Sequence, residues 1–82
     1  MNYGLIKRID AEREVAIEKW GDTDRTPGIL LNAITEEVGE VAHAINHKEG
    51  VNVIQQEIGE AMGVLARLYE MVEQEAKGGR HG

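Results

Sequence analysis

Apolar residues recur every three or four positions over three long stretches of the chain, and this spacing limits the possible folds more than any other feature. It places the apolar side chains on one face of an α-helix, whereas a half-buried strand would alternate apolar and polar residues. We find no such alternation. We therefore expect an all-α fold with helices at about residues 2–20, 27–47 and 52–77. The 82 residues suffice for one domain, which we place at residues 1–77, followed by a flexible tail at residues 78–82.

Local signals mark the ends of these helices. Gly21 is a plausible C-terminal stop for the first helix. Thr26 followed by Pro27 predicts the start of the second, because a threonine hydroxyl can cap free N–H groups and proline at the first helical position loses no hydrogen bond. Asn52 with Gln55 three residues later resembles a capping pair that opens the third helix.

Composition restricts the partners of such a domain. The net charge of −6 argues against a nucleic-acid polymer as a partner, and the lack of cysteine excludes disulfides and thiolate sites, which is compatible with a reducing cytosol. We see neither a signal peptide nor an apolar run of the ~20 residues that span a bilayer, and expect a cytoplasmic protein. Because so short a chain builds a small core, we expect three-helix protomers to assemble into a helical-bundle dimer or tetramer.

Each of the two later helices has an apolar stripe that we expect to form the core. On the second helix the stripe is Leu30, Ile34, Val38, Val41 and Ile45; on the third it is Ile54, Ile58, Ala61, Leu65, Leu68 and Val72. Small residues gather on the opposite face of the third helix, at Gly59, Gly63 and Ala66. They predict the close approach of another helix, for which a subunit contact is the simplest explanation.

Carboxylates at the borders of these stripes suggest a metal site. Glu37 and Glu40 on the second helix, and Glu57 and Glu60 on the third, are spaced so that each pair lies on one side of its helix. If the two helices pack antiparallel, the four carboxylates can converge and repel one another unless a hard divalent cation, Mg²⁺ or Mn²⁺, binds them.

Chance and a di-iron centre are the two alternatives for these glutamates. In a chain with 29% charged residues, two such pairs can arise by chance as solvated helix residues. A di-iron bundle needs a Glu-x-x-His motif on two helices, and Glu40 with His43 supplies only one. We expect His43 and His47 to face solvent.

The motifs together resemble the MazG-like all-α nucleoside triphosphate pyrophosphohydrolases. The sequence Glu36-Glu37-Val38-Gly39-Glu40 matches the Glu-Glu-x-x-Glu part of their signature, and Glu57-Ile58-Gly59-Glu60 follows after a spacer of the sixteen residues 41–56. The flanking text "ERE…EKWG" and "EEVGEVAHAI" is also similar to this family. Glu60 stands where the family usually has Asp, and Val64 where some relatives carry Tyr.

The resemblance implies Mg²⁺-dependent hydrolysis of a (deoxy)nucleoside triphosphate to the monophosphate and pyrophosphate, as part of nucleotide-pool housekeeping, with Mn²⁺ as a possible substitute. It implies metal binding by Glu37, Glu40, Glu57 and Glu60, and a role for Glu36 in orienting or deprotonating the attacking water. We further expect substrate contacts from Lys19, Trp20, Arg25, Asn32 and Arg67.

Two other functions remain as alternatives. One is phosphoribosyl-ATP pyrophosphohydrolase, which shares the carboxylate arrangement. The other is a non-catalytic helical oligomer that binds a partner protein or nucleotides, in which Glu60 marks a decayed site. An enzyme should gain thermal stability from magnesium and nucleotide together, whereas a protein-binding bundle should not respond to them.

Overall fold

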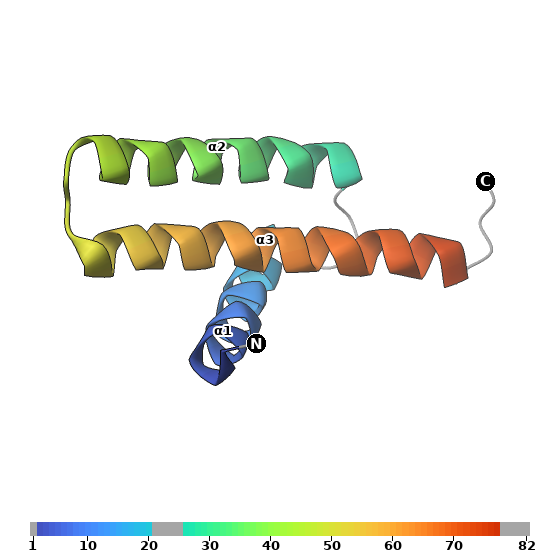
Figure 1. Cartoon of the computed structure of the whole chain (residues 1–82). Coiled ribbons are helices and arrows are strands. Elements are labelled where there is room, and N and C mark those ends of the chain that lie inside the picture. The colour runs from blue at the N-terminus through green and yellow to red at the C-terminus, as the bar shows by residue number, and fades with distance from the viewer. Residues whose placement is uncertain (1, 21–25, 78–82) are drawn as a thin grey trace.

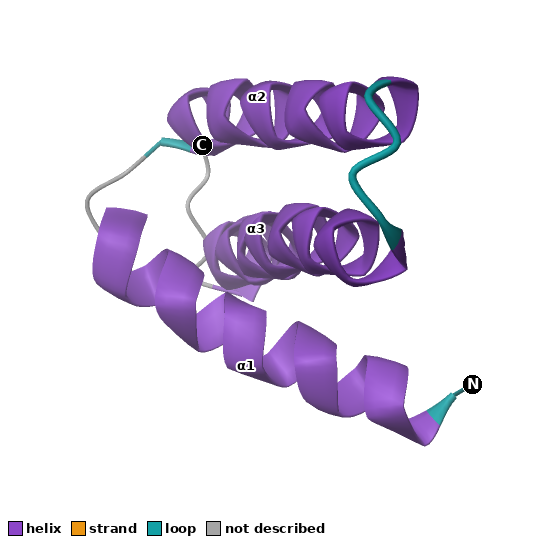
Figure 2. Cartoon of the chain, turned by 90° about the vertical axis from the view of Figure 1, so that its left-hand side faces the viewer, coloured by secondary structure: helices purple, strands orange, loops and turns teal. Residues whose placement is uncertain are grey.

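The computed structural model describes residues 2–20 and 26–77, and within them the chain forms three α-helices and no strand. Helix α1 spans Tyr3–Trp20, α2 spans Pro27–Asn46 and α3 spans Val51–Lys77. Helices α2 and α3 lie side by side and antiparallel, and α1 crosses α3 on another face (Figures 1 and 2). The all-α prediction is confirmed, and the observed helix ends lie within one residue of the predicted ones.

The start of α2 follows the predicted capping pattern. Thr26 has an extended backbone, and its Oγ1 accepts a hydrogen bond from the Ile29 N–H at 3.3 Å. Its carbonyl oxygen also accepts from the Ile29 and Leu30 N–H groups, at 3.0 and 3.3 Å. Pro27 occupies the first helical position, where its missing N–H has no partner to lose. Gly21, the predicted stop of α1, lies outside the described residues.

A tight turn connects α2 to α3. The Glu49 N–H donates to the Ala44 carbonyl at 3.0 Å and the Lys48 N–H donates to the Ile45 carbonyl at 3.1 Å, which is the hydrogen-bond pattern of a Schellman motif. Lys48 has a φ of 53° and Gly50 a φ of 105°, so the turn uses the left-handed region twice. The prediction of Asn52 as the helix cap was wrong, because α3 already begins at Val51 and Asn52 lies within its first turn.

The core lies where all three helices meet. It consists of Ala16 from α1, of Leu30, Ala33 and Ile34 from α2, and of Val64 and Met71 from α3, with Leu68 packed against it. The predicted stripes are therefore only partly correct. Val38 and Ile45 of α2 are each 53% exposed, because α3 packs nearer to the small residues Ala33 and Ala44.

The small-residue face of α3 contacts α1 of the same chain. A β-carbon on Gly63 would stand 2.6 Å from the backbone carbonyl carbon of Glu12 and 2.7 Å from its oxygen. One on Gly59 would stand 2.9 Å from Arg8 Nε. The predicted close approach of a helix is thus correct, but its assignment to a second subunit was wrong. Glycine spacing reports how near a neighbouring helix lies and carries no information about which chain supplies it.

An ion-pair network also joins α1 to α3. Arg13 Nε lies 2.7 and 2.8 Å from the two carboxylate oxygens of Glu70, and Arg13 Nη1 lies 2.6 Å from Glu14 Oε2. Arg67 is only 5% exposed and its Nη1 lies 4.0 Å from Glu70 Oε1. These contacts hold α1 across the middle of α3, with Ala16 turned into the core.

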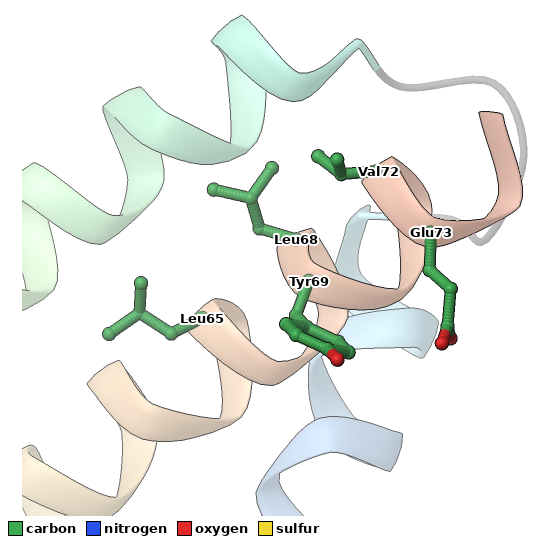
Figure 3. A pocket seen from close by; sticks show the side chains of 5 residues that line it. All are labelled: Leu65, Leu68, Tyr69, Val72 and Glu73. Carbon is green, nitrogen blue, oxygen red and sulfur yellow. The ribbon is translucent and has the colours of Figure 1, made fainter. Parts of the chain in front are cut away.

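Several large apolar side chains of α2 and α3 remain exposed. Leu65 and Val72, which were predicted to lie in the core of α3, are 48% and 51% exposed. Together with Leu68, Tyr69 and Glu73 they line an open groove of about 640 Å³ along the C-terminal half of α3 (Figure 3). In the described part of the chain no helix combines the length and the apolar character needed to cross a membrane.

Candidate metal centre

Four glutamates from two helices converge on one point. Glu37 and Glu40 extend from α2, and Glu57 and Glu60 from α3. Each contributes one carboxylate oxygen, and these four oxygens all lie within 4.8 Å of one another. The arrangement follows from helix geometry, because residues three apart lie on one side of a helix. Helices α2 and α3 pack antiparallel (Figure 1), and this packing brings the two pairs together.

The electrostatics of this cluster are unfavourable for four ionised carboxylates. Burial, the charge of Glu60 and contact with Glu40 raise the pKa of Glu57 from 4.5 to about 7. Burial also raises the pKa of Glu37, with further contributions from Glu40 and Glu60, while the positive charge of Lys19 opposes that rise. Like charges in a partly desolvated site favour the protonated form of each carboxyl group. A bound cation would therefore stabilise the ionised carboxylates of this cluster.

Two oxygens of the cluster have no donor within the described structure. Glu37 Oε1 and Glu57 Oε1 are buried and make no hydrogen bond among the described residues. A buried oxygen without a hydrogen-bond partner is unfavourable by about 1–3 kcal/mol, more if it is charged. A hard divalent cation satisfies such oxygens directly and neutralises the cluster. The residues present therefore fit a metal ion.

The distances also suit a small divalent ion. Oxygens on opposite sides of an octahedral Mg²⁺ are about 4.2 Å apart, twice a bond length of about 2.1 Å. The upper limit of 4.8 Å between the four carboxylate oxygens exceeds this value by an amount that small side-chain rotations can close.

Helix α1 closes one side of this centre. A small cavity of about 90 Å³ lies between α1 and the carboxylates, and its lining residues are Glu12, Val15, Ala16, Lys19, Glu37, Glu60 and Val64. Lys19, predicted to bind substrate, thus places a cationic side chain beside two of the four glutamates. The cavity is large enough for a few water molecules or a small part of a phosphate group.

A comparison with family models supports this interpretation of the site. The model of the MazG nucleotide pyrophosphohydrolase domain matches residues 25–78, which is more than half of the chain. The chain belongs to the MazG nucleotide pyrophosphohydrolase family. The matched region includes α2, the turn and α3, and therefore all four glutamates of the cluster. No curated protein and no solved structure matches the chain significantly.

The other residues predicted for this MazG domain lie at varying distances from the cluster. Glu36 and Asn32 are exposed on α2, and neither belongs to the group of four carboxylates. Arg67 is buried close to Glu70 and does not line the cavity beside Glu37 and Glu60. The side chain of Trp20 and the whole of Arg25 lie outside the described residues.

Sequence reasoning missed two residues near the MazG carboxylates. Glu12 of α1 lines the cavity, with its Oε2 accepting a hydrogen bond from Arg8 Nε at 2.9 Å. Gln56 Nε2 donates a hydrogen bond to Glu60 Oε2 at 3.2 Å. Gln56 could have been found, because it precedes Glu60 by one helical turn. Glu12 opens the segment "ERE" that resembles the family, but its position beside the centre depends on how α1 crosses α3.

The rival di-iron interpretation gains no support from the position of His43. This imidazole is exposed, and its Nε2 lies 3.4 Å from Glu49 Oε2 at the end of α2. Among the described acidic and histidine residues, only the four glutamates form a group in which each residue places one possible ligand atom within 4.8 Å of the others. A cluster of four carboxylates without histidine favours a hard cation such as Mg²⁺ or Mn²⁺ over iron.

Proposed function

We propose that this MazG domain hydrolyses nucleoside triphosphates to the monophosphate and pyrophosphate with the help of a divalent cation, Mg²⁺ or Mn²⁺. The observation that supports this most strongly is the convergence of four carboxylates from α2 and α3, two of which carry a buried oxygen without a donor. Without a cation, the repulsion between these carboxylates would destabilise so small a domain. A divalent cation that binds a triphosphate would remove this repulsion and explain why the four glutamates lie together.

In the proposed reaction, the oxygen of a water molecule forms a bond to the α-phosphorus. The bond from this phosphorus to the oxygen that bridges the α- and β-phosphates breaks, and its electron pair leaves with pyrophosphate. A bound Mg²⁺ supplies charge neutralisation for the phosphates and lowers the pKa of the water. Glu36, exposed beside Glu37, accepts the proton from the attacking water, which is the role of a general base.

Basic and polar side chains at the rim would hold the substrate. Lys19 is the best placed of them, because it lines the cavity beside Glu37 and Glu60, where the cation balances phosphate charge. Asn32, one helical turn before Glu36, is proposed to contact the sugar or base. Trp20 and Arg25 are proposed to contact the base and the triphosphate.

We further propose that the protein works in the cytoplasm as a homo-oligomer, a dimer or a tetramer. The exposed apolar side chains on α2 and α3 support this, since Val38, Ile45, Leu65 and Val72 are each about half exposed. The groove on α3 (Figure 3) extends this apolar surface. A second copy that packs there would enlarge a core that is small for an independent domain.

The experiment that tests the function is a panel of ribo- and deoxyribonucleoside triphosphates, together with phosphoribosyl-ATP, incubated with Mg²⁺. Pyrophosphate, orthophosphate and the nucleotide product are measured separately. We expect monophosphate and pyrophosphate in equal amounts from at least one nucleoside triphosphate, and no product from a Glu57→Gln variant. Release of orthophosphate and diphosphate would contradict attack at the α-phosphorus. Turnover of phosphoribosyl-ATP alone, or of no substrate, would favour the corresponding alternative function.

A further inference from the structure

One face of α1 borders the carboxylate centre. Four residues of α1 line the cavity beside it: Glu12, Val15, Ala16 and Lys19. Their spacing places them on one side of the helix. The contact of Gly63 with the backbone of Glu12 holds this side of α1 against α3. Lys19, two turns beyond Glu12, therefore lies at the end of this face, where Glu37 and Glu60 also line the cavity.

The charge of Lys19 acts on the centre. Burial raises the pKa of Glu37, and the positive charge of Lys19 opposes this rise. Glu12, the α1 carboxylate in the same cavity, accepts a hydrogen bond from Arg8 Nε at 2.9 Å, so its charge is already partly balanced. No acidic residue stands three or four positions before Lys19 on α1. Lys19 therefore supplies positive charge to the carboxylates of α2 and α3.

The side chain of Lys19 is also suited to change its partner. Lys19 is exposed and belongs to the last turn of α1. Its ammonium group is carried on a flexible four-carbon chain, and exposed ion pairs of this kind contribute little net stability. A divalent cation held directly by several carboxylates binds far more strongly, and it repels a nearby ammonium group. Lys19 can therefore neutralise the metal-free centre without blocking it.

We propose that Lys19 is the counter-ion of the metal-free carboxylate centre and that its ammonium group moves to the substrate phosphates when a divalent cation binds. Because Lys19 and the cation compete for Glu37 and Glu60, Lys19 weakens the binding of a bare ion. A triphosphate that accompanies the ion offers the displaced ammonium group new negative charge, a step that rests on the proposed function. Lys19 thus makes the centre favour a metal–triphosphate complex over the bare ion.

Two binding measurements on the full chain test this proposal. The first is a titration with Mn²⁺ alone, followed by the electron paramagnetic resonance of the free ion. The second is calorimetric titration, at saturating Mn²⁺, with the α,β-methylene analogues of ATP, GTP, CTP and UTP, in which the bond to be cleaved is replaced by one that resists hydrolysis. Neither measurement depends on turnover.

The variants are Lys19→Gln, which removes the charge, and Lys19→Arg, which keeps it. Lys7→Gln is the matched control, because Lys7 is also exposed on α1 and its loss changes the net charge of the chain by the same amount. Twelve residues separate positions 7 and 19, which is about 18 Å along a helix, so Lys7 is remote from the centre.

We expect Lys19→Gln to bind bare Mn²⁺ about threefold to tenfold more tightly than the wild type, because a like charge has been removed from beside the ion. The same variant should bind the best analogue at least about tenfold more weakly, because the phosphates lose a charged partner. Lys19→Arg should stay closer to the wild type in both measurements, and Lys7→Gln should match it.

Bare Mn²⁺ affinity that is unchanged or lower in Lys19→Gln would overturn the proposal. So would an equal gain of affinity in Lys7→Gln, since the effect would then come from net charge and not from position. Analogue binding that is the same in the wild type and Lys19→Gln would overturn this proposal alone. Failure of the wild type to bind any of the four analogues with Mn²⁺ would contradict the proposed function as well.

Discussion

Gly63 of α3 lies directly against the backbone of Glu12 in α1. A β-carbon at position 63 would stand 2.5 Å from Glu12 Cβ and 2.6 Å from its carbonyl carbon, closer than real β-carbons approach other atoms. The absence of a side chain at this position therefore sets the separation of α1 from α3. Because Glu12 and Lys19 of α1 line the cavity beside Glu37 and Glu60, this separation also shapes the candidate site.

The first prediction follows from this contact. Gly63→Ala should lower the free energy of unfolding by about 1–3 kcal/mol, because the backbone of α1 must shift to admit one methyl group. Gly39→Ala is the matched control, since a β-carbon there meets nothing within 4 Å. It should raise stability by about 0.5–1 kcal/mol through the better helix propensity of alanine. Urea denaturation measures the free energy of unfolding of both variants. Equal changes in this free energy for Gly63→Ala and Gly39→Ala would contradict the close packing of α1 on α3.

The second prediction concerns the turn between α2 and α3. Lys48→Gly should stabilise the protein by about 1 kcal/mol, since glycine adopts the left-handed conformation at the end of the Schellman motif without steric cost. Gly50→Ala should destabilise it by about 1 kcal/mol or more, because Gly50 has a φ of 105° although its surroundings are open. Thermal unfolding measures both, and a destabilising Lys48→Gly would show that the turn is not built as described.

The sequence predicted the helices well because their signals are local. Thr26 with Pro27 sets the start of α2 through hydrogen bonds to neighbouring residues, and these bonds are observed. The pairing of Glu37 and Glu40 with Glu57 and Glu60 needed only one further assumption, that α2 and α3 pack antiparallel.

The faces of the helices were predicted less well, because they depend on long-range packing. Helix α3 has neighbours on two faces, so Val64 and Met71 are buried while Leu65 and Val72, at the centre of the apolar stripe, remain half exposed. The position of Arg67 also depends on long-range packing. Its spacing from Glu60 suggested a place near the carboxylates, but the crossing of α1 buries it close to Glu70.

The third prediction is a pH dependence of the metal-free protein. The folded-state pKa of Glu57 is about 7, above its ordinary value of 4.5, so the folded state binds this proton more tightly than the unfolded state. The contribution of Glu57 to stability is therefore complete below about pH 4.5 and is lost as the pH rises through about 7. Metal-free Glu57→Gln should be as stable as the wild type or more stable at neutral pH, because an uncompensated partly buried charge has been removed.

Denaturation at a series of pH values in the presence of a chelator measures this effect. Glu75→Gln, an exposed substitution on the same helix, serves as the control and should keep the pH dependence of the wild type. A Glu57→Gln variant that loses several kcal/mol relative to the wild type at neutral pH would instead assign Glu57 a purely structural role.

The fourth prediction is self-association through the exposed apolar surface of α2 and α3. Sedimentation should find no folded species near 9.1 kDa at micromolar concentration. Tyr69→Lys, in the groove of α3, should weaken the oligomer, whereas the same substitution at Tyr3 of α1 should not. The two tyrosines are 71% and 75% exposed, so they differ in position and hardly in accessibility. Dissociation by Tyr3→Lys, or a stable wild-type monomer, would contradict the prediction.

The fifth prediction concerns Glu60, which stands where the family usually has aspartate. Mn²⁺ is larger than Mg²⁺ and tolerates less regular ligand placement, so it should support activity at least as well as Mg²⁺ in the wild type. Glu60→Asp should shift the preference towards Mg²⁺ while activity is retained. Assays of both proteins with each metal check this, and an unchanged preference would show that the length of this side chain does not set the geometry of the centre.

Direct titration of Mn²⁺ binding, followed by the electron paramagnetic resonance of the free ion, tests the central claim that the four glutamates form one metal centre. The wild type should bind the ion, and Glu37→Gln, Glu57→Gln and Glu60→Ala should each weaken binding by about tenfold or more, because each removes a carboxylate ligand. The control is Glu75→Gln, which lies on α3 like Glu57 and Glu60 but outside the cluster. It should bind Mn²⁺ with the affinity of the wild type. Unchanged Mn²⁺ affinity in Glu57→Gln and Glu60→Ala would contradict the four-carboxylate centre and the function proposed from it.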